Sequence, residues 1–395
     1  MPRKSKIGPG LITAAVVVGP GSITVCTKLG ATMGYSILWT IVISSIMMII
    51  FTRIGTMIGI MSRESFLSTI SRKYGFVVSL VIGGSVFFIT TGFQIGNNIG
   101  VGLALETIFG GTTWLWALLF TVISLVFLWS SNSFYSLLEK LMTALVLIMV
   151  ISFFGNLLII RPSMGEILKG LIPSKPQSFG LVIAVSATTF SVAAASFQTY
   201  LVRSKGWTKK DISKGLKDSA IGIIILSIIC MVIIITSAAV LKPVGITVNS
   251  AVEMAMQLEP LLGSFAKWMF LFGLWAGSFS SFIVNAMIGG TFLADGLSLG
   301  SSLDSLWAKI FASIIMILGT AATMLLGENP IQLLVITQAT TIFGVPLIAL
   351  FMMILANDYE VMGEYKSGFI TNIIGSLAVL WLLYLSFRQF LAILA

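Results

Sequence analysis

The sequence predicts an all-α integral membrane protein with about eleven transmembrane helices, and three observations support this class. First, 57% of the 395 residues are hydrophobic and 9% are charged, whereas a soluble domain carries about 25% charged residues. Second, several apolar runs reach the ~20 residues that cross a hydrocarbon core. Third, the basic residues behind the net charge of +9 lie in short segments between these runs. We therefore expect one membrane domain, 1–395.

The apolar runs are separated by short segments rich in Gly, Pro or charged residues, which mark the ends of the spans. The predicted spans are 9–33, 35–60, 76–108, 113–130, 134–160, 179–203, 220–241, 261–292, 306–326, 331–356 and 368–387.

Basic residues predict the orientation, because cytoplasmic loops carry an excess of Lys and Arg. They gather before the first span, between the second and third, and between the sixth and seventh: Arg3, Lys4, Lys6, Arg63, Arg72, Lys73, Arg203, Lys205, Lys209, Lys210, Lys214 and Lys217. An odd number of spans puts these three segments on one side. We expect a multi-pass protein of the cell membrane, with a cytoplasmic N-terminus and an extracytoplasmic C-terminus.

Other classes of protein fit the sequence less well. The positive charge lies in interhelical loops, as membrane topology requires, so nucleic acid is not an expected partner. The chain has no His, the usual general base, and no recognisable catalytic motif, so an enzyme is not expected. A channel would need a repeated pore element or an oligomeric ring. A receptor or scaffold without transport is the remaining alternative, and the scarcity of long extramembrane segments disfavours it.

Two spans carry signs of a broken helix. The first contains Gly19-Pro20-Gly21-Ser22, where Pro removes a backbone donor and Gly frees the backbone. The sixth is small and polar over residues 191–199, so we predict interruptions at 19–22 and around 193–198. Small residues and kinks also serve helix packing. Their matched placement instead favours two inverted repeats, about 9–160 and 179–356, plus an extra helix at 368–387, with a transport site between the repeats.

Several segments resemble the NRAMP family of divalent-metal transporters. They are 8–12 and 19–22 in the first span, 98–105 in the third, 271–278 in the eighth, 337–346 in the tenth, and 361–363. The resemblance covers most of the chain and implies a LeuT-like fold. It also implies transport of a small ion by alternating access in the lipid bilayer, without a cofactor, by a protein that we expect to act as a monomer.

The family's site residues have been replaced in this chain. Its metal-binding Asp and Asn of the first helix fall on Gly19 and Ser22, and its sixth-helix Met-Pro-His-Asn stretch falls on residues 196–199. Among the family's ligand types, Gln338 is retained. The predicted substrate-binding residues are Gly19, Ser22, Ala193, Ser196, Gln198 and Gln338, and of these Gly19, Ser22, Ala193 and Gln338 are the predicted metal contacts.

The chemistry of these residues shapes the expected substrate. None of the 14 acidic residues lies near the middle of a span, and the chain has no His. Neutral oxygen ligands suit a hard, partly hydrated ion, so a divalent cation of the Mg²⁺ or Mn²⁺ class is expected, with Mg²⁺ favoured. The family's acidic pair on the third helix falls on Gln94 and Asn97, so proton coupling is not expected.

An anion or small neutral solute is the alternative substrate. The N-terminus of a broken helix attracts negative charge, and Lys28 lies about two turns beyond the first break. Lys28 could instead snorkel to the interface. Gln94, Asn97 and Asn98 form a candidate polar pathway, although amides also join neighbouring membrane helices.

Overall fold

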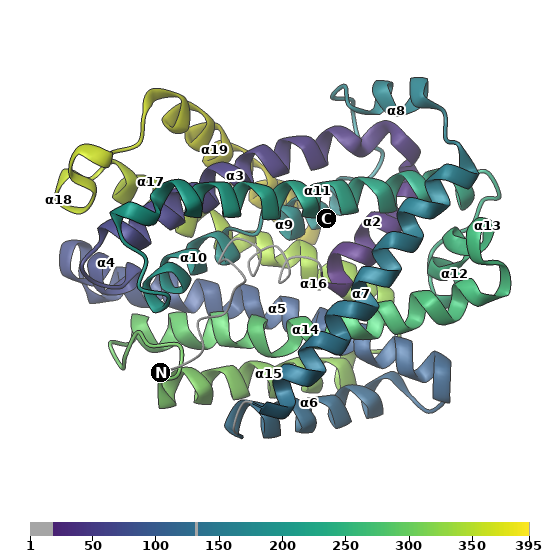
Figure 1. Cartoon of the computed structure of the whole chain (residues 1–395), viewed down its shortest axis with the longest axis horizontal. Helices are drawn as coiled ribbons and strands as arrows, with labels where there is room; N and C mark the ends of the chain where they lie inside the picture. Colours follow the sequence, from purple (N-terminus) through teal and green to yellow (C-terminus); the bar gives the residue numbers. More distant parts are fainter. Residues whose placement is uncertain (1–18, 131–132, 395) are drawn as a thin grey trace.

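The structure, a computed structural model, describes residues 19–130 and 133–394, and this part is built from helices without strands (Figure 1). The helices are α2 (Pro20–Met33), α3 (Leu38–Met61), α4 (Phe66–Tyr74), α5 (Phe76–Phe109), α6 (Thr113–Trp129), α7 (Ser133–Ile160), α8 (Met164–Gly170), α9 (Phe179–Thr189), α10 (Val192–Ser204), α11 (Ile212–Val240), α12 (Ala251–Ala255), α13 (Glu259–Leu262), α14 (Ala266–Gly296), α15 (Leu306–Leu326), α16 (Pro330–Thr340), α17 (Val345–Asn357), α18 (Tyr359–Met362) and α19 (Phe369–Leu394).

Each predicted span has a helical counterpart in the described residues. Nine helical stretches are long and apolar enough to cross a membrane, and one of them, Pro20–Met61, joins the first and second predicted spans. The fourth predicted span is the shorter apolar helix Thr113–Trp129. Residues 9–18 of the first predicted span, and the motif at 8–12, lie outside the described residues.

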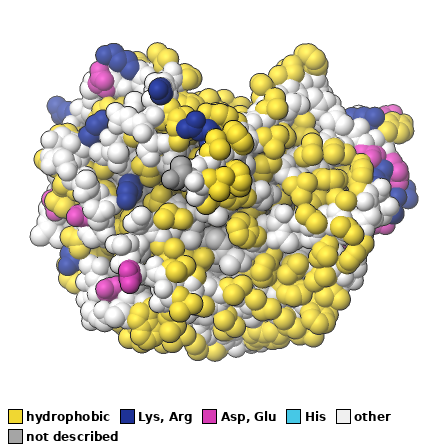
Figure 2. Space-filling view, turned by 180° about the vertical axis from the view of Figure 1, so that it is seen from behind, with side chains coloured by type: hydrophobic (Ala, Val, Ile, Leu, Met, Phe, Trp, Pro, Cys, Tyr) yellow, Lys and Arg dark blue, Asp and Glu magenta, His cyan; other side chains and the backbone are white. Residues whose placement is uncertain are grey.

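The surface supports a membrane-spanning arrangement. Most long helices run along the long axis of the molecule, with α4 and α18 at one end and α8, α12 and α13 at the other (Figure 1). Charged side chains lie towards the two ends of the face in Figure 2, and hydrophobic side chains cover much of the region between them. Large apolar residues are exposed on this surface, for example Leu158 at 77% and Phe369 at 79%. Such a surface is stable against lipid rather than water.

The sixth span is broken, but earlier than the sequence predicted. Helix α9 ends at Thr189 and α10 begins at Val192, so the interruption lies at Phe190 and Ser191. The predicted interruption around 193–198 was wrong, because those small residues continue as helix α10. The tenth span also changes geometry, through a 3₁₀ turn at Thr341–Gly344 before Pro346 at the start of α17.

Two close helix pairs match one another across the two halves of the chain. Helix α2 packs against α11, and α10 packs against α3. A Cβ on Gly30 of α2 would lie 2.4 Å from the Ile234 oxygen of α11, and one on Gly55 of α3 would lie 2.2 Å from the Ala195 oxygen of α10. Glycine therefore allows backbone-to-backbone contact in both pairs. This correspondence of helices one and seven with helices six and two is the one that two inverted repeats produce.

Candidate functional site: a neutral cavity between broken helices

A cavity of about 40 Å³ lies where the helix breaks meet. A water-sized particle needs about 10–15 Å³ by this measure, so the space suits an ion with one or two waters. The cavity is lined by Gly19, Pro20, Gly21, Ser22, Thr90, Phe93, Asn97, Thr188, Ser191, Ala193, Ala194, Asn285, Ile288 and Gln338. These residues come from both halves of the chain.

Two helix ends of opposite polarity face the cavity. Helix α2 begins at Pro20 without a side-chain cap, so its first amides are free to donate and carry partial positive charge. Helix α9 ends at Thr189, so its last carbonyl oxygens have no partner within the helix and carry partial negative charge. The start of α10, at Val192 and also without a side-chain cap, adds a third helix end at the cavity. Ends of both polarities are therefore present, and the side chains decide which charge the cavity favours.

Amide side chains from three helices give the cavity a preference for a positively charged solute. The Gln338 Oε1 of α16 is buried and accepts no hydrogen bond from the described residues. Asn285 of α14 donates through Nδ2 to the Thr90 oxygen (2.8 Å) and to Gln94 Oε1 (3.1 Å), which leaves its Oδ1 as an available acceptor. Asn97 of α5 likewise uses its Nδ2, at 3.5 Å from Gln94 Oε1. Three available oxygens make the cavity a neutral acceptor site suited to a cation.

Glycines hold the Gln338 amide in place. A Cβ on Gly21 would lie 2.7 Å from Gln338 Cδ, and a Cβ on Gly96 would lie 2.6 Å from Gln338 Nε2. The amide is therefore confined between the start of α2 and the middle of α5, at positions where any other residue would displace it.

Among the described residues, none that lines the cavity has an ionisable side chain. Within the described part of the chain, no group of three or more His, Cys, Asp or Glu side chains could hold a metal ion. A transition metal bound through thiolate, imidazole or carboxylate groups has no such ligand set here.

The sequence was compared with known proteins. The model of the natural resistance-associated macrophage protein-like family matches residues 10–392. The chain belongs to the NRAMP family. Among its relatives, the divalent metal cation transporter MntH of Yersinia pestis is 24% identical, covering 96% of this chain and 92% of the relative. MntH of Klebsiella pneumoniae is 25% identical, covering 92% and 88%.

Solved structures show the same fold. The manganese transporter of Eremococcus coleocola superposes with a TM-score of 0.76 at 18% identity, over 96% of this chain and 84% of that one. The nucleobase-cation-symport-1 family transporter Mhp1 superposes with a TM-score of 0.62 at 14% identity, over 93% and 81%. The expected LeuT-like fold is confirmed. The NRAMP chain is thus a multi-pass membrane transporter of small ions and not an enzyme.

The cavity brings together five of the residues that the sequence singled out: Gly19, Ser22, Asn97, Ala193 and Gln338. Ser196 and Gln198 lie deeper in α10 and do not line it. The Ser196 hydroxyl donates to the Ala193 oxygen at 2.9 Å, and Gln198 Nε2 donates to Ser219 Oγ of α11 at 3.1 Å. Both residues were predicted from an ungapped match to the NRAMP pattern. Because the helix break lies earlier, at Phe190 and Ser191, these two positions fall inside α10 and not at the cavity.

Gln94 and Asn98 form a polar chain that leads away from the cavity. The Asn98 amide donates to the Gln94 carbonyl oxygen at 2.8 Å, and its oxygen accepts from Thr320 Oγ1 of α15 at 2.8 Å. The Thr320 hydroxyl lies 2.6 Å from the Thr121 hydroxyl of α6. These buried groups join α5 to α6 and α15. Lys28, which the sequence grouped with them, is half-buried on α2 and lines neither the cavity nor this chain.

Asn285 is the cavity residue that the sequence analysis missed. It is a lone amide within the apolar helix α14, without the neighbouring amides or the family resemblance that singled out Gln94 and Asn97 on α5. Thr90 and Thr188 were also missed. Threonine is frequent in membrane helices, so its presence alone does not distinguish a cavity residue from a packing residue.

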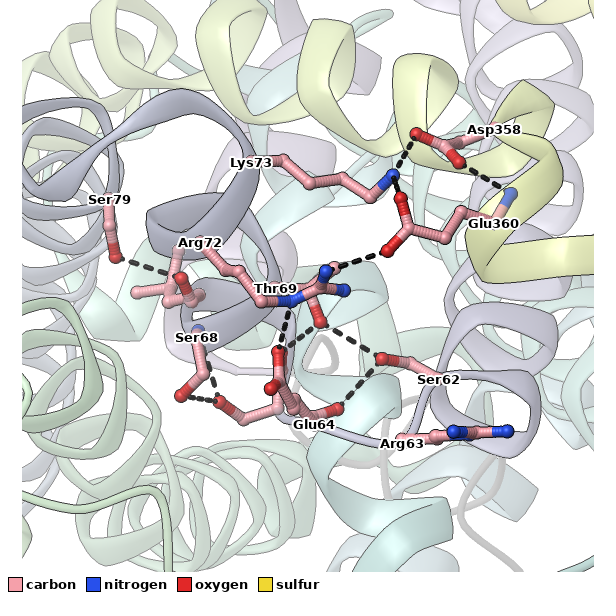
Figure 3. A network of polar contacts seen from close by, with 12 residues as sticks. Ser62, Arg63, Glu64, Ser68, Thr69, Arg72, Lys73, Ser79, Asp358 and Glu360 are labelled. Carbon is pink, nitrogen blue, oxygen red and sulfur yellow. Dashed lines mark hydrogen bonds and ion pairs between the residues drawn. The ribbon is translucent and has the colours of Figure 1, made fainter.

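The charges missing from the cavity appear at the end of the molecule that carries α4 and α18 (Figure 3). Lys73 of α4 contacts Asp358 at 2.8 Å and Glu360 at 2.6 Å, and Arg72 contacts Glu360 at 2.6 Å and Glu64 at 3.1 Å. The hydrogen bonds from Lys73 and Arg72 hold the pKa of Glu360 at about 2, below its ordinary value of 4.5. We call these five side chains the end network.

Asp295, near the end of α14, connects α14 to α10 and α4 through hydrogen bonds. Its carboxylate is 2% exposed and accepts hydrogen bonds from the Tyr200 hydroxyl of α10 at 2.6 Å and from Ser68 Oγ of α4 at 2.9 Å. The broken helix pair α9–α10 is therefore tied to α4 and α14 at the end remote from its break.

Proposed function

We propose that this NRAMP-family protein transports a divalent cation by alternating access, with the neutral cavity as its substrate site. The observation that carries the proposal is that three amide side chains, Asn97, Asn285 and Gln338, line one cavity beside the carbonyl end of α9, with the Gln338 Oε1 buried and without a hydrogen-bond partner among the described residues. Oxygen dipoles aimed at one space favour a cation there. The relatives named as divalent metal cation transporters support the charge of the substrate.

The ligand chemistry favours Mg²⁺ over Mn²⁺ within this class. Mg²⁺ accepts neutral oxygen ligands while it keeps several of its own waters, whereas later divalent metals gain more from imidazole and thiolate ligands. Among the described residues, no Asp or Glu lines the cavity to compensate the double charge. Binding should therefore be weak, with a dissociation constant of about 1 mM. Gly19, Ser22 and Ala193 are proposed to contribute backbone or hydroxyl oxygens around the ion.

We further propose that transport is not coupled to protons. Gln94 and Asn97 replace the acidic pair expected from the NRAMP pattern, and amides do not gain or lose protons near neutral pH. The polar chain from Gln94 to Thr121 consists of amides and hydroxyls only. A cell-membrane location, a cytoplasmic N-terminus and a monomeric transporter without nucleic-acid partners complete the proposal.

Restoring one carboxylate tests the substrate. Gly19 precedes α2 with extended backbone (φ −100°, ψ −178°), so Asp fits the conformation and also suits the helix N-cap. Gly19→Asp should tighten divalent binding at least tenfold and shift the preference from Mg²⁺ towards Mn²⁺, as measured by titration calorimetry on purified protein. Gly165→Asp, at an exposed position in the first turn of α8, is the control for added charge.

An anion-binding result would replace this proposal. If neither the natural chain nor Gly19→Asp binds a divalent cation, and a small anion binds with an affinity that Lys28→Ala lowers, the cavity belongs to an anion or neutral-solute transporter.

Proteoliposomes loaded with a pH-sensitive dye test the coupling. Mg²⁺ uptake by the natural chain should leave the internal pH unchanged. Acidification in proportion to uptake would show that a proton carrier operates and that the amide replacements do not explain the mechanism.

A further inference from the structure

A second recess, with basic residues in its lining, lies where α3, the segment after α18 and α19 meet. It forms between the last turns of α3, the segment after α18 and the start of α19, and has a volume of about 40 Å³. Its polar lining consists of Arg53, Tyr365, Lys366, Ser367 and Thr371. None of the residues lining it is acidic, so the recess carries two uncompensated positive charges.

Arg53 is in an unusual position for a cation. It is exposed on α3, eight residues before the helix ends at Met61, which is about 12 Å along the helix axis. Ile46, about two turns earlier on the same face of α3, is 46% exposed, as expected for a lipid-facing surface. Within the described part of the chain the Arg53 side chain makes no ion pair or hydrogen bond. A charge at this depth is costly unless an anion or water reaches it.

Thr371 gives the recess an available hydroxyl. The residue is 9% exposed, it lines the recess, and its Oγ1 has no hydrogen-bond partner among the described residues. It lies in the first turn of α19, a helix of 26 residues whose first amides have no partners within the helix. The positive end of this helix and the hydroxyl face the same space as Arg53 and Lys366, which is an arrangement that binds a phosphate oxygen.

The surroundings indicate a lipid rather than a soluble ion. Phe369 and Ile370, beside the recess on α19, are 79% and 71% exposed, so acyl chains must cover them. Lys366 extends over the Tyr359 ring, 5.2 Å from its centroid, and its charge stays without an acidic partner. Basic pockets between transmembrane helices bind acidic lipid headgroups when they lie at headgroup depth. We infer that this recess binds the phosphate of an anionic phospholipid, clamped by Arg53, Lys366 and Thr371.

Native mass spectrometry of the full chain in detergent tests the inference, with phosphatidylglycerol and phosphatidylcholine as probes. The natural chain should retain phosphatidylglycerol and not phosphatidylcholine. Arg53→Gln with Lys366→Gln should reduce the retained phosphatidylglycerol at least fivefold. Thr371→Val keeps both charges and should reduce it about twofold. Lys210→Gln removes an exposed charge elsewhere and should change nothing.

Three results would overturn the inference. Retention that is unchanged in the double variant would show that the lipid binds elsewhere. An equal loss in Lys210→Gln would show a general effect of positive charge. Displacement of phosphatidylglycerol by millimolar inorganic phosphate would show that the recess is a site for free phosphate. An unchanged melting temperature of the double variant distinguishes a local loss of the lipid site from misfolding and does not depend on the proposed substrate.

Discussion

The central cavity and the end network of the same protein use opposite chemistry. The cavity is lined by amides, hydroxyls and backbone, whereas the end network consists of two cations and three carboxylates. At the network, water reaches most side chains, with Arg72 and Glu360 50% and 59% exposed, so charge costs little there. At the cavity, a fixed carboxylate would face the interior of the bilayer. Charge has been kept where solvent stabilises it.

This difference also separates two tasks. The network joins α4 to α18 through long, flexible side chains that can part and re-form. The cavity depends on short side chains held by packing, such as the Gln338 amide between Gly21 and Gly96. We therefore expect substitutions in the cavity to change binding strongly and substitutions in the network to change stability modestly.

The largest effect is expected from Gly96→Ala. The added Cβ would lie 2.6 Å from Gln338 Nε2, the end of a side chain that can shift, so the amide leaves its position while the helices stay packed. A misplacement of about 1 Å at a binding group can cost about 100-fold in activity. Mg²⁺ uptake into proteoliposomes should fall by about that factor, without a matching drop in the melting temperature.

Gly84→Ala is the matched control on the same helix, because a Cβ there meets no atom within 4 Å. Equal uptake by the two variants would break the comparison, since it would show that the position of the Gln338 amide does not matter for transport.

A smaller effect is expected from the Lys73–Asp358 pair. Its side chains are 14% and 17% exposed, so their interaction should exceed that of a fully exposed pair. A double-mutant cycle with Lys73→Met and Asp358→Asn should give a coupling of about 1 kcal/mol in the free energy of unfolding. A coupling near zero would mean that the network is a surface feature without a structural role.

The smallest effect concerns pH. The pKa of Glu360 in the folded protein is about 2, below its ordinary 4.5, so its pairing stabilises the fold fully above pH 4.5 and loses that contribution as the pH falls towards 2. The difference in melting temperature between the natural chain and Glu360→Gln should be constant from pH 7 to pH 5 and shrink by pH 3. A difference that is largest at low pH would contradict this assignment.

The sequence predicted the membrane spans well and the cavity residues only in part, because the two leave different kinds of pattern in the sequence. The spans followed from long apolar runs, because a bilayer imposes length and polarity on every helix. The start of α2 was visible as Gly19 and Pro20, whereas the predicted interruption at 19–22 is not seen within α2, which is helical from Pro20 onwards. The break before α10 was misplaced, because Phe190 and Ser191 carry no helix-breaking residue and the chain leaves the helix there for tertiary reasons. Asn285 was missed because only the contact of α14 with α5 brings it to the cavity.

The glycine contacts of α2 and α10 have a mechanical consequence. Where backbones touch, no side chain can rotate to absorb a displacement, so α2 and α11 form one stiff unit, and α10 and α3 form another. A movement of α2 or α10 must therefore carry a full-length membrane helix with it. The joint that the described residues show is the non-helical segment at Phe190 and Ser191, which adjoins the cavity. An ion in the cavity lies next to this joint. A small displacement at the joint produces a larger movement at the far end of α10, together with α3 that packs against it.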